Sequence, residues 1–71
     1  MTNEHRAFVD ILTNQPGYRM KRIELSNEMS RRRAMGFGVE IDDIIFAFKE
    51  RGLASYDAES DTVTYIPASR G

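Results

Sequence analysis

Six basic residues between positions 19 and 33 are the side chains of this sequence best suited to binding phosphate. They are Arg19, Lys21, Arg22, Arg31, Arg32 and Arg33. Three adjacent guanidinium groups at the end of a helix can donate paired hydrogen bonds to phosphate oxygens, and the other three would widen that surface if the fold brings them alongside. The same arginines can instead offset the helix dipole or bridge to acids of a later helix. The sequence therefore predicts either a nucleic-acid contact or an internal counter-charge.

Beyond position 40 the sequence is acidic, and its chemistry suits a protein partner. In a helix that turns 100° per residue, Phe46 lies about 140° from the apolar Ile41 and between two acids, so we expect it to be partly exposed. An aromatic residue rimmed by carboxylates suits a protein interface, in which aromatics anchor and charges select. Phe46 can alternatively pack under the first helix or under the loop before its own helix. The candidate protein-binding residues are Asp42, Asp43, Phe46 and Glu50.

The residue types that catalysis and metal binding require are missing or misplaced. The chain has no cysteine, and His5 is its only histidine, so it lacks a disulfide framework, a thiolate zinc site and a cysteine-histidine pair. Adjacent acids on a helix point about 100° apart and cannot converge on one site. Asp57, Glu59 and Asp61 lack the glycine and the terminal glutamate of a calcium loop, so we expect a solvated turn there. The sequence predicts no enzyme, no metal and no cofactor.

Length and composition predict one small domain at residues 1–67, followed by a short mobile tail at 68–71. The chain has 71 residues, of which 41% are hydrophobic and 30% are charged, and its net charge is −1. The charges are segregated, because positions 19–33 hold six cations against two carboxylates and positions 40–61 hold seven carboxylates against two cations. The chain has no long apolar run and no secretory signal at its N-terminus, so we expect a cytoplasmic protein with no membrane contact.

The first part of the chain is predicted to form a helix and a short strand. The helix covers about 2–14, with Thr2 or Asn3 as its cap, and ends in a proline-glycine turn. A very short strand at 18–21 alternates apolar and basic residues, which would let it pair with a hairpin later in the chain.

A second helix is predicted from about 23 to 33, followed by a loop. Two glycines interrupt the helical pattern at 34–38, which gives a longer connection than a simple helix-turn-helix has. We expect the loop to bury Met35 and Phe37.

The third helix begins at Ile41 and leads into a predicted hairpin. Gly52 is placed to take a left-handed conformation at the helix end, with Leu53 folding back on the helix. Strands are expected at 53–57 and 62–66. The predicted core consists of Phe8, Ile11, Leu12, Leu25, Met29, Ile41, Ile44, Ile45, Phe48, Leu53, Val63 and Tyr65.

Two segments resemble those of bacterial winged-helix regulators. Residues 22–29 look like the helix that positions the recognition helix, and residues 46–56 look like the end of the recognition helix where it enters the wing. The resemblance implies an α+β, winged-helix-like fold with three helices followed by a C-terminal β-hairpin, and a small DNA-binding transcriptional regulator. The chain departs from the family because both usual DNA-contacting surfaces are acidic here, at Glu40, Asp42, Asp43 and the turn 57–61.

The residues and the resemblance support two hypotheses about function. The first is a DNA-binding regulator that contacts duplex phosphate through the six basic residues, and we place it first because DNA binding is the commonest use of that fold. The second is a protein-binding winged helix, either an adaptor or an inhibitor that mimics nucleic acid, whose acidic third helix docks on a basic protein surface. Self-association between the basic pole of one copy and the acidic pole of another, giving a homo-oligomer, can accompany either.

Overall fold

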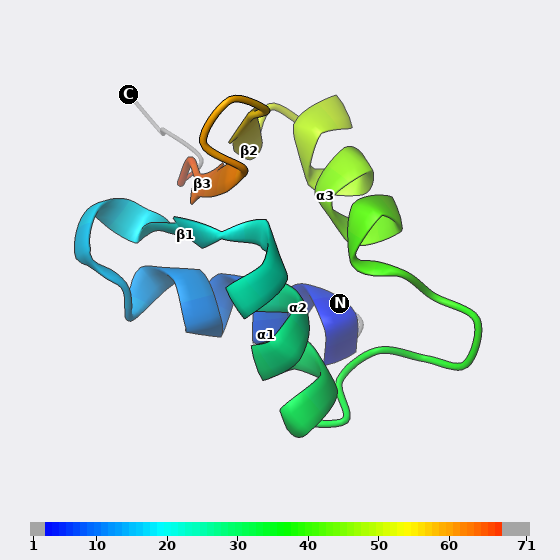
Figure 1. Ribbon diagram of the computed structural model, residues 1–71. Coiled ribbons are helices and arrows are strands. Elements are labelled where there is room, and N and C mark those ends of the chain that lie inside the picture. The colour runs from blue at the N-terminus through cyan, green and yellow to red at the C-terminus, as the bar shows by residue number, and fades with distance from the viewer. Residues whose placement is uncertain (1–2, 68–71) are drawn as a thin grey trace.

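The computed structural model describes residues 3–67, so Thr2 and the predicted tail at 68–71 lie outside the described residues. The elements, in chain order, are α1 (Asn3–Thr13), the 3₁₀ helix η1 (Pro16–Tyr18), β1 (Arg19–Lys21), α2 (Arg22–Arg31), α3 (Ile41–Glu50), β2 (Ala54–Asp57) and β3 (Thr62–Tyr65). Three α-helices and a small antiparallel sheet make an α+β fold in which β2 and β3 form the predicted C-terminal hairpin (Figure 1).

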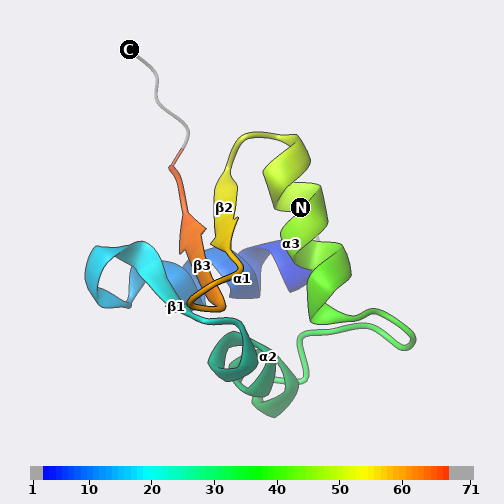
Figure 2. The ribbon, with the colours of Figure 1, turned by 45° about the horizontal axis from the view of Figure 1, so that its top comes forward.

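The sheet is built around β3, which lies between β1 and β2 (Figure 2). Both pairings are antiparallel, and Val63 of β3 is opposite Met20 of β1 on one side and Tyr56 of β2 on the other. Val63 is fully buried, as expected for the inward side chain of a central strand. The short early strand is therefore confirmed, and its pairing ties the segment after α1 to the C-terminal hairpin.

The core lies between the helices and the sheet. Phe8 of α1 stacks on Phe48 of α3 with ring centroids 4.0 Å apart. Ten of the twelve predicted core residues are buried, whereas Leu53 and Tyr65 are only partly buried because they lie at the open end of the hairpin, at the margin of the core. Two small residues are buried in addition, Ala34 and Ala54.

The end of α3 has the predicted geometry. Gly52 has a φ of +72°, and the Leu53 N–H donates to the carbonyl oxygen of Phe48 at 2.9 Å. A left-handed residue followed by this long-range bond satisfies carbonyls that the helix end would otherwise leave free.

The end of α2 has the same geometry without a glycine. Arg33 has a φ of +54°, and the Ala34 N–H donates to the carbonyl oxygen of Met29 at 2.9 Å. The helix consequently ends at Arg31, two residues before its predicted end. A left-handed conformation costs a residue with a side chain about 1–2 kcal/mol, so the turn at Arg33 is strained.

The loop between α2 and α3 corrects one prediction, because Phe37 is fully exposed and not buried. The Val39 N–H donates to the carbonyl oxygen of Gly36 at 3.1 Å, which makes Phe37 and Gly38 the two central residues of a tight turn. The Gly36 N–H donates to the Glu4 carboxylate at 3.0 Å and holds the base of this turn against α1. Met35, as predicted, packs against the core.

Candidate binding surfaces

The six basic residues proposed to bind phosphate form two groups at opposite ends of α2. Arg19, Lys21 and Arg22 lie in β1 and at the start of the helix, and the other three lie at or just beyond its C-terminal end. The ten residues of α2 span about 14 Å at a rise of 1.5 Å each. The fold therefore does not bring all six residues alongside one another.

Arg22 is held by an internal network at the start of α2. Its Nε donates to Asp61 Oδ1 at 3.0 Å, and its terminal nitrogen lies 3.6 Å from Asp42 Oδ1 on α3. The Tyr56 hydroxyl donates to the same Asp61 oxygen. The hydrogen bonds from Tyr56 and Arg22 lower the pKa of Asp61, while the bond to Asp61 raises the pKa of Tyr56. The pKa of the Arg22 guanidinium is raised, chiefly by its bond to Asp61.

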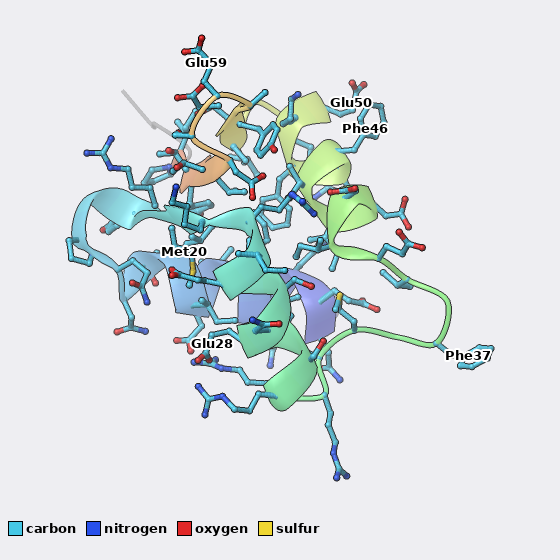
Figure 3. The ribbon with its side chains drawn as sticks, in the orientation of Figure 1. Met20, Glu28, Phe37, Phe46, Glu50 and Glu59 are labelled. Atoms are coloured by element: carbon cyan, nitrogen blue, oxygen red, sulfur yellow. The ribbon has the colours of Figure 1, made fainter. Side chains whose placement is uncertain are left out.

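The same network braces the tip of the hairpin, where Asp57, Ala58 and Glu59 are exposed, as expected of a solvated turn, while Asp61 is half-buried. The Arg22 N–H donates to the Asp61 carbonyl oxygen at 2.8 Å, and Lys21 Nζ donates to the Ser60 carbonyl oxygen at 2.8 Å. The turn is also braced from within, because Asp57 accepts a hydrogen bond from the Ser60 hydroxyl at 2.9 Å. Glu59 extends from the turn into solvent (Figure 3).

Two of the three adjacent arginines are paired within the helices. Arg31 bonds Glu28, and Arg32 donates to Asp10 of α1 at 2.6 Å and lies 3.7 Å from Glu28. The expected bridge from this run to the acids of α3 is therefore wrong, and of the six basic residues Arg22 is the one that reaches them. Arg33 is exposed and has no charged partner among residues 3–67.

A basic residue that the sequence did not single out, Arg6 of α1, completes a surface with Arg32 and Arg33. These arginines and Asp10 line an open depression of about 700 Å³ between α1 and the end of α2, whose apolar lining includes Val9. We call this surface the basic depression. The exposed position of Arg6 follows from the helical pattern of α1, but nothing in the sequence indicates that the end of α2 lies beside it.

The four predicted protein-binding residues lie on one side of α3, which we call the α3 face. They are Asp42, Asp43, Phe46 and Glu50. Phe46 is 61% exposed, as predicted, and projects outward beside Glu50 (Figure 3). Asp43 also caps the helix, since its carboxylate accepts a hydrogen bond from the Glu40 N–H at 3.2 Å. Acids in the first turn favour helix formation through the dipole, so part of the acidity of α3 has a structural cause.

The α3 side of the molecule carries a second exposed aromatic. Phe37, at the tip of the loop that leads into α3, projects away from the body of the molecule (Figure 3). Beside Phe46, a shallow depression of about 400 Å³ lies between α3 and β2, and its lining includes Ile45, Lys49 and Tyr56. Contiguous apolar patches mark interaction sites more strongly than single exposed side chains do, so the interest of Phe46 lies in the partly apolar depression beside it.

Comparison of the chain with protein-family models, curated proteins and solved structures finds no match. Within residues 3–67, no three histidine, cysteine or acidic side chains gather as a metal site would require. The described helices are all too short or too polar to cross a lipid bilayer.

Proposed function

We propose that this chain is a winged-helix domain that binds a basic protein surface through the α3 face, as an adaptor or an inhibitor. The order of the elements and the strand order β1-β3-β2 are compatible with winged-helix architecture. The observation that carries the proposal is Phe46, which is 61% exposed among carboxylates on the helix that a winged-helix protein ordinarily uses for recognition.

The state of the basic residues supports a protein partner over duplex DNA. Four of the six, Lys21, Arg22, Arg31 and Arg32, already donate to carboxylates or to a carbonyl oxygen within the fold. Each of these internal bonds would have to be weakened or shared to bind phosphate, while the α3 face would repel the duplex. The carboxylates of that face would instead attract and orient a cationic protein.

The energetic expectation is that Phe46 anchors the interface. Burying a large apolar side chain contributes about 1.5–3 kcal/mol, and 1.4 kcal/mol is tenfold in affinity. We therefore expect Phe46→Ala to weaken partner binding by about 10–100-fold without unfolding the domain, because the side chain is mostly exposed.

The test is affinity capture from an extract of the source organism with three baits. Wild type and the control Ile66→Ala should retain the same protein, and Phe46→Ala should lose it. Ile66 is a suitable control because it is an exposed apolar residue after β3, outside the α3 face. If Phe46→Ala captures that protein as well as wild type does, Phe46 is not the anchor and the proposal fails.

Duplex DNA is a second candidate partner, favoured by one observation, the convergence of Arg6, Arg32 and Arg33 on the basic depression. Three cations on one surface can bind consecutive phosphates. Binding should then weaken steeply with salt, and Arg6→Ala with Arg33→Ala should lower the slope of log affinity against log salt by about 2. Fluorescence anisotropy of a random duplex measures both quantities. A domain that binds no duplex at low salt is not a DNA-binding regulator.

A further inference from the structure

The basic depression and the α3 face are complementary in charge and in shape. The depression is lined by three arginines and Asp10, which leaves a net charge of +2, around apolar side chains that include Ala7 and Val9. The α3 face presents three carboxylates around one protruding aromatic ring, with Lys49 and Arg22 as the neighbouring cations, which leaves −1. A depression of about 700 Å³ has room for a side chain of this size together with its polar neighbours.

These two surfaces point in opposite directions, so they cannot meet within one chain. Phe8 and Phe48 stack between α1 and α3 at 4.0 Å. Arg6 and Phe46 each lie two residues before one of these rings, and two residues turn a helix by about 200°, which places each on the side away from the stack. The stacked pair therefore separates the two surfaces.

We propose that the α3 face of one copy docks in the basic depression of a second copy. Phe46 enters the depression, and the carboxylates of the α3 face lie against Arg6 and Arg33, which have no charged partner among the described residues of their own chain. Because the two surfaces differ and face apart, the contact is head-to-tail, and a pair of copies keeps one free α3 face and one free basic depression, to which further copies can bind. This inference rests on the proposed function, since it uses the same α3 face and names a second copy as a partner.

The first measurement is sedimentation velocity of the wild-type protein over a concentration series up to about 1 mM, where contacts of about 4 kcal/mol become visible. Species larger than a dimer should appear as concentration rises. They should dissociate between about 0.01 M and about 1 M salt, as the Debye length falls from about 30 Å to about 3 Å. A wild type that stays monomeric throughout, or that stops at a dimer, overturns the inference.

The second measurement uses complementary variants. Phe46→Ala removes the aromatic ring of the α3 face, and Arg33→Glu reverses a charge in the basic depression. Each variant alone should therefore be monomeric. An equimolar mixture should form a 1:1 complex of about twice 8.1 kDa and nothing larger. The intact α3 face of Arg33→Glu can dock in the intact basic depression of Phe46→Ala, and no other pair of intact surfaces remains. Arg6→Glu is an independent acceptor variant should Arg33→Glu fail to fold, and a mixture that remains monomeric overturns the head-to-tail contact.

These outcomes separate the inference from the proposed function. If wild type is monomeric and Phe46→Ala still loses a captured protein, the α3 face binds a foreign partner and self-association is wrong. If wild type is monomeric and the arginine variants lose duplex binding, the basic depression belongs to nucleic acid, which also overturns the inference. Assembly that requires Phe46 while no foreign protein is captured supports the second copy as the partner.

Discussion

Asp61 shows how much of this fold depends on a single acceptor. Its carboxylate receives hydrogen bonds from Tyr56 and Arg22, its carbonyl oxygen receives the Arg22 N–H, and its backbone is left-handed with a φ of +54°. The residue thus joins the hairpin to the start of α2. Because α2 also meets α3 through Arg22 and Asp42, the position of the hairpin relative to α3 depends on this network.

The first residue-scale prediction is that Asp61→Asn makes stability less dependent on pH. The pKa of Asp61 is lower in the folded state than in the unfolded state. Its carboxylate therefore contributes to folding stability above the unfolded-state pKa of about 3.9, and this contribution is lost as pH falls through the folded-state pKa. The pKa of Tyr56 is higher in the folded state than in the unfolded state. Its protonated hydroxyl therefore contributes to folding stability below about pH 10, and this contribution is lost as pH rises through the folded-state pKa. Asparagine tolerates a left-handed backbone, so the substitution tests the charge alone.

Thermal unfolding at about pH 3, about pH 7 and about pH 10.5 measures this dependence. Asp61→Asn should be least stable relative to wild type near neutral pH, and the difference should shrink at both extremes. Glu59→Gln, an exposed acid of the same turn, is the matched control and should follow the wild-type profile. If the pH profile of Asp61→Asn runs parallel to that of wild type, the network does not change the pKa of Asp61 on folding, and the prediction is wrong.

Two of the exposed aromatics, Phe46 and Phe37, show what residue patterns can predict. The exposure of Phe46 follows from its angle on a regular helix, where every position is fixed by the period of 3.6 residues. Phe37 lies in a turn whose shape depends on a bond from Gly36 to Glu4, a contact between residues 32 positions apart. No local pattern encodes that bond, and burial of Phe37 was therefore a wrong prediction.

At the scale of the elements, the ends of α2 and α3 are a natural comparison. Both helices end in a left-handed residue, but α3 uses Gly52 and α2 uses Arg33. The periodicity of α2 predicts its existence and its buried residues correctly. Its end was misplaced because an arginine carries no signal for a left-handed turn, whereas a glycine does.

The element-scale prediction is that exchanging these residue types moves stability in opposite directions. Gly52→Ala should cost about 1 kcal/mol and lower the melting temperature by about 4–8 °C, since a Cβ at this position meets no atom within 4 Å and only the backbone is strained. Arg33→Gly should relieve that strain, but glycine also makes the unfolded chain more flexible, which offsets part of the gain. The net increase in the free energy of unfolding should be about 0.5 kcal/mol. Calorimetry measures both. A loss of stability in Arg33→Gly would mean that the Arg33 side chain makes a stabilising contact.

At the scale of the whole molecule, the sequence predicts that the charges are segregated, but it does not predict where the charged surfaces lie in space. The basic and acidic stretches are separate along the chain, and the acids of α3, unlike those of the turn 57–61, remain together on one face. The basic stretch does not, because α2 carries its two halves to opposite ends and Asp10, Glu28 and Asp61 neutralise much of it. The surface that emerges in its place includes Arg6, brought there by the packing of α1 against α2.

The central place of β3 has a consequence for synthesis on the ribosome. The partner of β1 emerges about forty residues later, which is several seconds at typical translation rates of about 5–20 residues per second. During that interval α1 has no sheet to cover its apolar residues, and Val63, the centre of the sheet, has not yet been made. Until β3 is made, the nascent chain exposes apolar surface that favours aggregation, and its yield in cells should depend on that delay.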